Sequence, residues 1–272
     1  MRVAIVGAGN LGGAVAAGLV ASGALDPSDL RCVTRTAEGA ERLRARPGLA
    51  DVTVTQDAAA AVTGADVVML GVKPYGVIDL LTRLGPHLAP GVTIVSLAAG
   101  VGLDDLAAAA PDGAGVVRLM TNTPVEVRAA VSLVAAAPGV DPATIARVVA
   151  LADALGTTHV IDEARFDAAT ALAGSGPAYV FLLVELLRDG GVTLGLDADA
   201  ALAMATGVID GAARLLAASD GDPVALRRAV TSPGGMTAAA IGVLEDAGLR
   251  VSVVDALAAA VARAAELKAP PA

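Results

Sequence analysis

The chain has 272 residues, which is long for one hydrophobic core and sufficient for two, since single cores stop growing at roughly 250–300 residues. Its net charge of −9 argues against a nucleic-acid partner, whose binding surface would need clustered Lys and Arg. The single cysteine, Cys32, rules out a disulfide within the chain, so we expect a reducing compartment and a cytoplasmic location.

Hydrophobic residues make up 55% of the chain and aromatic residues only 1%. Two uncharged stretches, 88–103 and 168–184, are interrupted by glycine and fall short of the roughly 20 apolar residues of a membrane span. The high hydrophobic content therefore predicts closely packed, buried elements, and we expect no membrane partner.

The first half of the chain alternates short apolar strands with helical segments. Strands are expected over Arg2–Val6, Leu30–Thr34, Val52–Val54, Val67–Gly71, Thr93–Leu97, Val116–Met120 and Val131–Ala135. Helices are expected over Leu11–Ser22, Ala37–Ala45 and Val77–Leu84. Helices between strands predict βαβ units and a parallel sheet, and the continuous apolar strands suit burial on both faces.

From about Arg165 the pattern changes to successive helices. Asp197, Asp222 and Ser252 each precede a segment with helical spacing. The helices are expected over Ala198–Ala218, Val224–Val230, Thr237–Ala247 and Val253–Lys268. The fold class is therefore α/β, with a Rossmann-type nucleotide-binding domain at 1–163 followed by an all-helical domain at 164–272.

The segment Ala178–Val184, directly after Pro177, is apolar at every position. A helix without a polar face must be buried all round. Either the neighbouring helices of the same chain wrap it or a second subunit covers it. We favour the second subunit, which predicts a homodimer formed through the helical domain.

A glycine-rich turn follows the first strand and opens a helix, with the sequence Gly7-Ala8-Gly9-Asn10-Leu11-Gly12. In a strand–turn–helix context, Gly7 permits the tight turn, Gly9 permits close approach of a diphosphate, and Gly12 permits close helix–strand packing. Asn10 and Leu11 supply N–H groups at the helix start, where anions bind. The turn predicts a dinucleotide site.

The end of the second strand indicates which dinucleotide binds. NAD-binding proteins usually place an acid there, against the ribose hydroxyls, whereas this chain reads Thr34-Arg35-Thr36. Arg35 can hold a 2′-phosphate, and Thr36 can donate a hydrogen bond to it. We expect a preference for NADPH, with NADH still accepted.

Three further turns follow later strands of the predicted sheet. Val72, Lys73 and Pro74 form the first, Ala98 and Ala99 lie in the second, and Asn122 lies in the third. Ligands bind at the carboxyl edge of open α/β sheets, so these turns are expected to line a nicotinamide pocket. Lys73 can be a catalytic acid, support the cofactor ribose or simply be solvated, and we favour the role at the cofactor.

Two glycine-containing loops precede helices in the second half. Ser232-Pro233-Gly234-Gly235-Met236-Thr237 exposes N–H groups at a helix start, where a carboxylate or phosphate can bind. The second loop, 174–179, contains Ser175. From spacing alone, Thr237 and Ser175 can each be a helix cap or a ligand contact.

Together these motifs resemble the series found in pyrroline-5-carboxylate reductases. The segments that carry the resemblance are Val72–Pro74, Ser96–Val101, Asn122–Pro124, Ala173–Tyr179 and Val230–Thr237. The order and spacing of these segments match the family over essentially the whole chain, and the Gly-Ser-Gly-Pro-Ala-Tyr and Thr-Ser-Pro-Gly-Gly-x-Thr elements are quite specific to that family.

The resemblance implies reduction of 1-pyrroline-5-carboxylate to L-proline by NADPH, and a helical dimerisation domain that often builds higher oligomers. It also implies that Ser232, Gly234, Gly235 and Met236 bind the substrate carboxylate, that Ser175 lies near the substrate, and that Thr237 contacts the ring nitrogen as the catalytic residue. No metal site is expected.

The chain departs from the family pattern at two places near the nicotinamide side. Thr121 stands where the family has a proline, and Val127–Ala130 replaces a glycine-rich stretch. Two other functions stay open: an NADPH-binding paralogue that reduces another cyclic imine, and a regulatory homologue without catalysis. A 2-hydroxy acid dehydrogenase is disfavoured because such enzymes are expected to use a lysine in the helical domain, and none precedes Lys268 there.

Overall fold

The computed structural model describes residues Met1–Lys268 and divides into two compact units. The sheet unit comprises Met1–Ser175 together with the chain from Ala260 on, and the helical unit comprises Gly176–Ala259. This division falls later than the domain boundary expected after residue 163. Residues 164–175 group with the sheet because Arg118 and Asn122, on a strand of the sheet and at its exit, contact Phe166 and Ala173.

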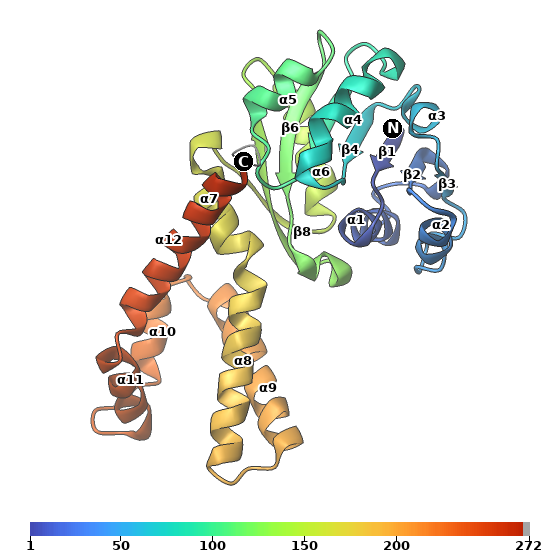
Figure 1. Cartoon of the computed structure of the whole chain (residues 1–272). Coiled ribbons are helices and arrows are strands. Elements are labelled where there is room, and N and C mark those ends of the chain that lie inside the picture. The colour runs from blue at the N-terminus through green and yellow to red at the C-terminus, as the bar shows by residue number, and fades with distance from the viewer. Residues whose placement is uncertain (269–272) are drawn as a thin grey trace. The chain divides into compact units, whose positions relative to one another are not determined.

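The sheet unit is built on an eight-stranded sheet with the order β3-β2-β1-β4-β5-β6-β7-β8 (Figure 1). Its strands are β1 (Val3–Val6), β2 (Leu30–Val33), β3 (Thr53–Thr55), β4 (Val67–Leu70), β5 (Thr93–Ser96), β6 (Gly115–Met120), β7 (Ala130–Ala136) and β8 (Gly156–Val160). The first six strands are parallel and follow the order of a Rossmann fold, in which the strand order reverses between β1 and β4. The Rossmann prediction is confirmed.

The far edge of the sheet differs from the expected all-parallel arrangement. β7 runs antiparallel to β6, with Leu119 opposite Val134, and β8 then pairs parallel with β7. The reversal follows from the short connection between β6 and β7, which contains only the one-turn helix η4 (Thr123–Val127) where a parallel crossover needs a longer segment. β8 was not predicted, because its residues Gly-Thr-Thr-His-Val are mostly polar.

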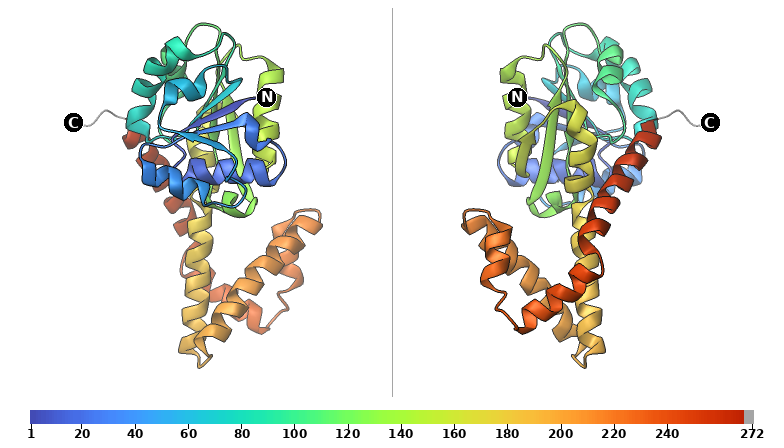
Figure 2. Two further views of the ribbon diagram at one scale, coloured as in Figure 1. Left: turned by 90° about the vertical axis from the view of Figure 1, so that its right-hand side faces the viewer. Right: turned by 90° about the vertical axis from the view of Figure 1, so that its left-hand side faces the viewer.

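Helices cover both faces of the sheet, as the two views in Figure 2 show. α1 (Asn10–Ala21), α2 (Ala37–Arg44) and α6 (Pro142–Asp153) contribute to the core on one face, and α3 (Ala58–Val62), α4 (Val77–Leu84) and α5 (Leu103–Ala109) to the core on the other. Along β1, Val3 and Ile5 belong to the first core and Ala4 to the second. Burial on both faces explains why the strands lack alternation.

The sheet unit also contains a short segment that follows β8. Its parts are the one-turn helix η5 (Glu163–Arg165), the helix α7 (Phe166–Ala169) and a π-helical turn, η6 (Thr170–Gly174). The amide of Ser175 closes the π-turn on the carbonyl of Thr170 at 3.2 Å. Such turns are rare and frequently lie at functional sites.

The helical unit contains α8 (Gly176–Thr193), α9 (Ala198–Ala218), α10 (Pro223–Ala229), α11 (Met236–Asp246) and most of α12 (Leu249–Lys268). Asp197 and Asp222 accept hydrogen bonds from the first turns of α9 and α10, so both predicted caps are confirmed. Ser252 is not a cap, because α12 begins earlier and the Ser252 hydroxyl donates to the carbonyl of Gly248 one turn back.

Many apolar residues of α8 and α9 are not covered by the chain itself. Phe181, Leu182, Leu186, Met204 and Val208 are all exposed. Within the described residues, two helical stretches, Glu163–Thr193 and Ala198–Ala218, have the length and hydropathy of a membrane span, with only 6% and 11% of their most apolar windows buried. Core and interface helices of proteins without a membrane pass the same test. Helices of the same chain therefore do not wrap Ala178–Val184, which was the alternative to the favoured cover by a second subunit.

Arg128 occupies a backbone conformation that favours glycine, with φ 55 and ψ 37 at the end of η4. Substitution Arg128→Gly should raise the free energy of unfolding of the sheet unit by about 0.5–1 kcal/mol, because it relieves left-handed strain. Arg147→Gly, on the exposed side of α6, is the matched control and should lower that free energy by about 0.5–1 kcal/mol. Denaturant melts measure both changes, and a loss of stability in Arg128→Gly would contradict the strain.

Candidate functional site

The turn between β1 and α1 brings three glycines into contact. A Cβ atom on Gly12 would lie 2.6 Å from the carbonyl oxygen of Gly7, and one on Gly71 would lie 2.8 Å from the same atom. Gly7 has φ +96, a conformation that other residues rarely adopt. These glycines let the start of α1 pack directly on the ends of β1 and β4.

Gly9 differs from these glycines because the space above it is open. It is exposed, and a Cβ atom there would meet nothing within 4 Å. Gly9 is also the N-cap of α1, and no side chain among the described residues caps this helix start. A free helix N-terminus beside an open glycine is an arrangement that fits the diphosphate of a dinucleotide.

The end of β2 carries the residues predicted to select the cofactor. Arg35 and Thr36 are both exposed, and the Thr36 hydroxyl accepts the amide of Gly39 at 3.1 Å as the N-cap of α2. The sequence analysis missed Glu38 in the first turn of α2. Hydrogen bonds from its own backbone amide, and then from the Thr36 side chain, hold the pKa of Glu38 below its usual value. Arg42, on the same helix, lowers the pKa of this carboxyl further, so Glu38 is an anion at the start of α2.

The three predicted turns after β4, β5 and β6 lie at one edge, because these strands are parallel neighbours. Val72, Lys73 and Pro74 lead into the one-turn helix η2 (Pro74–Gly76), and the ammonium-bearing Lys73 is exposed. Ala98 is buried, with its amide 3.3 Å from the Ser96 hydroxyl, and Ala99 is exposed. With Gly7–Gly12 after β1 and Arg35 after β2, all predicted cofactor residues follow the carboxyl ends of adjacent strands.

Asn122 is buried and its side chain is fully engaged within the sheet unit. Its amide nitrogen donates to the carbonyl of Ala173 at 2.9 Å, and its amide oxygen accepts the backbone N–H of Val131 at 3.0 Å. Asn122 therefore joins β6, β7 and the π-helical turn.

Thr121 lies in the same turn and replaces the family proline without leaving a polar group unsatisfied. Its hydroxyl accepts a hydrogen bond from Ser132 on β7 at 3.1 Å, and both residues are buried. This departure from the family pattern is therefore accommodated between two strands.

The loop before α11 lies in the helical unit. Gly235 is the N-cap of α11 and provides no side chain, so the first turn has free N–H groups as the sequence indicated. Thr237 is the second residue of the helix and is exposed, so it does not act as the cap. The amide of Gly235 donates to the Ser232 carbonyl at 3.0 Å and Gly234 has φ +69, which closes the loop.

Ser175 lies at the end of the π-helical turn in the sheet unit, and Ser232 is exposed in the loop of the helical unit. Met236 is exposed as the first residue of α11. The structure thus presents each predicted substrate residue at a helix start or at the turn before one.

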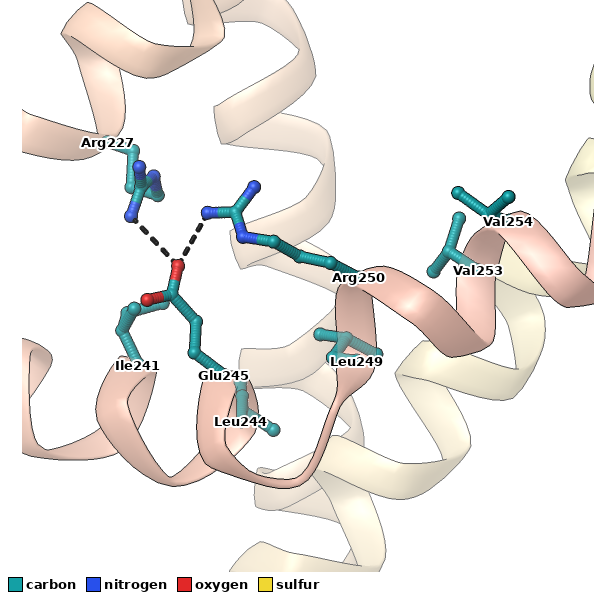
Figure 3. Close-up of a pocket in the computed structure, with 8 residues that line it drawn as sticks. All are labelled: Arg227, Ile241, Leu244, Glu245, Leu249, Arg250, Val253 and Val254. Carbon is teal, nitrogen blue, oxygen red and sulfur yellow. Dashed lines mark hydrogen bonds and ion pairs between the residues drawn. The ribbon is translucent and has the colours of Figure 1, made fainter.

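A pocket in the helical unit, drawn in Figure 3, is separate from this loop. It lies among α10, α11 and α12 and has a volume of about 520 Å³. Glu245 pairs there with Arg250 at 2.5 Å and with Arg227 at 3.6 Å, as the dashed lines in Figure 3 mark. The remaining lining is apolar, and none of the predicted site residues belongs to it.

Thiol and metal chemistry have no support in the part of the chain that the structure describes. Cys32 is buried in β2, and burial raises the pKa of its thiol to about 12. Among residues 1–268, no group of His, Cys, Asp and Glu is arranged to hold a metal ion.

The Rossmann order, the open glycine at a helix start and the polar carboxyl edge define a dinucleotide-binding oxidoreductase. A family model described as "NADP oxidoreductase coenzyme F420-dependent" matches residues 2–100, and one described as "Pyrroline-5-carboxylate reductase dimerisation" matches residues 163–267. The pyrroline-5-carboxylate reductase of Corynebacterium melassecola is 35% identical to the chain over 268 residues, which cover 97% of this chain and 98% of the relative. The chain belongs to the pyrroline-5-carboxylate reductase family, whose members are NADP-dependent oxidoreductases.

Solved structures agree with this assignment. A pyrroline-5-carboxylate reductase from Coxiella burnetii has 34% identity and a TM-score of 0.91, with 99% of each chain covered. The Plasmodium falciparum pyrroline carboxylate reductase, solved with NADP bound, shares the fold at 24% identity, with a TM-score of 0.87 and coverage of 99% of this chain and 98% of that one.

The glycine turn yields a prediction that separates packing from ligand binding. Gly9→Ala should fold normally, because its Cβ meets nothing within 4 Å, yet weaken NADPH binding by blocking approach of the diphosphate. Gly12→Ala should instead destabilise the sheet unit, since its Cβ would collide with Gly7 at 2.6 Å. Thermal melts with and without NADPH compare the two variants. Equal NADPH affinity in Gly9→Ala and the wild type would contradict the assignment.

Proposed function

We propose that this protein reduces 1-pyrroline-5-carboxylate to L-proline with NADPH. Two features of the structure together carry the proposal. The carboxyl edge of the Rossmann sheet has an open glycine at a helix start, which suits a dinucleotide. A glycine loop in the helical unit leaves the N-terminus of α11 without a side-chain cap. Identity of 35% to a pyrroline-5-carboxylate reductase over nearly the full length of both chains supports the same activity.

The sheet unit would hold the cofactor. The N–H groups at the start of α1, around Gly9, Asn10 and Leu11, would bind the diphosphate, and Arg35 and Thr36 would bind the 2′-phosphate. The turns at Val72–Pro74, Ala98–Ala99 and Asn122 would flank the nicotinamide half. When bound, NADPH supplies a hydride to the imine carbon, and a proton on the ring nitrogen balances the reaction.

The helical unit would hold the substrate. Ser232, Gly234, Gly235 and Met236 surround the uncapped start of α11, where backbone N–H groups and the helix dipole favour a carboxylate. Thr237, one residue further along the helix, would donate or accept a hydrogen bond at the ring nitrogen. Ser175, at the end of the π-helical turn in the sheet unit, is proposed as a further substrate-binding residue.

The catalytic demand on the protein is small, because a protonated imine is already electrophilic. The residues therefore act mainly by positioning the imine carbon and orienting its nitrogen. This explains how a site without a buried acid or base in its predicted residues can support the reaction.

We further propose that a second copy of the chain covers the apolar faces of α8 and α9 and forms a homodimer. The exposed side chains of these helices, among them Phe181, Leu182 and Met204, would lose contact with water there. The match of the dimerisation model to residues 163–267 supports this arrangement over insertion into a membrane. A protein of this kind would act in the cytoplasm.

Cofactor choice is tested at Arg35. Arg35→Ala should weaken NADPH binding by roughly 10- to 150-fold, the equivalent of about 1.5–3 kcal/mol for a charge-assisted hydrogen bond, and leave NADH binding unchanged. Arg83→Ala removes an exposed arginine on α4 and serves as the control. Dissociation constants for both cofactors measure the effect. A parallel loss of NADPH and NADH affinity would contradict a 2′-phosphate contact.

The proposed reaction is tested by following NADPH oxidation with and without 1-pyrroline-5-carboxylate and identifying proline as the product. The wild type should turn over, and Thr237→Ala should lower kcat by roughly 10- to 100-fold because the ring nitrogen loses its partner. Thr237→Ser keeps the hydroxyl and should retain most of the activity. NADPH binding without oxidation would favour another imine or a regulatory homologue, and normal kinetics in Thr237→Ala would exclude the role of Thr237.

A further inference from the structure

Arg118 is buried in the sheet unit, although it carries a permanent charge. It lies on β6 with only 2% of its surface exposed, and it is the one charged residue among the buried residues that the structure describes. It lies between Val116 and Met120 on the strand face that packs against α4 and α5. Burying a guanidinium is unfavourable unless partners compensate for the lost water.

The partners of Arg118 come from the segment after β8. Its Nη1 atom donates to Oε1 of Glu163 in η5, and its Cζ atom lies 3.9 Å from the centroid of the Phe166 ring in α7. Oε1 of Glu163 also accepts the backbone N–H of Leu103, at the start of α5, at 3.3 Å. Arg118 thus fixes the beginning of this segment to β6 and α5.

The same strand face holds the end of that segment. Residues 118, 120 and 122 alternate along β6 and its exit, so they follow one face. Met120 lies against Gly174, where a Cβ atom would approach its sulfur to 3.1 Å, and Asn122 donates to the carbonyl of Ala173 at 2.9 Å. One strand therefore carries both the anchor at Glu163 and the contacts at the π-helical turn.

The ion pair is not optimal for stability. The Nε atom of Arg118 and the Oε2 atom of Glu163 are buried without hydrogen-bond partners among the described residues. Well-packed apolar residues often replace buried ion pairs without loss of stability, whereas a directional pair can hold one arrangement in preference to others. The pair therefore suits a role in orientation.

We propose that Arg118 is a positioning residue for the reductase reaction, acting through Glu163 and Phe166 on the segment that ends at Ser175. The inference rests on the proposed function, because Ser175 and the turn at Asn122 matter only if substrate and nicotinamide bind beside them. By fixing Glu163 and Phe166 to β6, Arg118 sets the start of the segment that leads to Ser175 at the carboxyl edge. Misplacement of about 1 Å at such a site lowers turnover by up to roughly a hundredfold.

The test uses the full chain and the variants Arg118→Lys, Arg118→Met and the double variant Arg118→Met with Glu163→Met. The double variant leaves no unpaired buried charge, so it should melt within a few degrees of the wild type and bind NADPH normally. Its kcat should fall roughly 10- to 100-fold, and amide hydrogen exchange should accelerate over residues 163–175. Arg118→Lys keeps the ion pair and should recover most of the turnover.

The exposed pair of Arg83 and Asp79 on α4 provides the control, because replacing both residues by Met should change none of these quantities. Wild-type kcat and unchanged exchange in the double Arg118 variant would overturn the positioning role. A double variant in which melting temperature, NADPH affinity and turnover all fall together would also overturn the positioning role, in favour of a purely structural one. Absence of turnover in the wild type would contradict the proposed function itself, while the exchange data would still show whether Arg118 anchors the segment.

Discussion

The burial of apolar surface is the constraint on which the rest of the structure depends, and the two units meet it differently. The sheet unit buries its strands between helices on both faces, with separate cores built around residues such as Ile5 and Leu70. The helical unit leaves Phe181, Leu186 and Val208 exposed. A single chain therefore completes the core of its sheet unit and leaves the apolar side chains of its helical unit exposed, which supports the proposed dimer.

The strand order of the sheet unit brings the turns predicted to bind the cofactor to one edge of the sheet. Because the first six strands are parallel, the turns after β1, β2, β4, β5 and β6 all open at one edge. Three glycines at 7, 12 and 71 permit close packing there, and Gly9 keeps the space for the ligand open. Buried side-chain hydrogen bonds hold this edge in shape, such as those of Asn122 to β7 and to the π-helical turn.

Much of this architecture could be predicted from the sequence, because its signals are local. The glycine spacing at Gly7–Gly12 defined the first turn, and Asp197 and Asp222 marked helix starts correctly. Other features depend on contacts between distant residues. The polar strand β8 and the ion pair between Arg118 and Glu163 follow from packing that no local pattern contains.

In the candidate site too, some features could be predicted from the sequence and others could not. The sequence placed Arg35, Lys73 and Thr237 in turns and helix starts, where the structure has them exposed. It did not indicate that hydrogen bonds in the first turn of α2 lower the pKa of Glu38, because those contacts depend on how the helix begins. The roles of the individual residues toward NADPH and the imine stay predictions.

The measurement that tests the central claim most directly is the mass of the protein in solution together with its specific activity on dilution. The account predicts a particle of at least two chains of 26.4 kDa that loses activity when it dissociates, because the exposed faces of α8 and α9 need a second copy. A folded monomer with full NADPH-dependent turnover would contradict it.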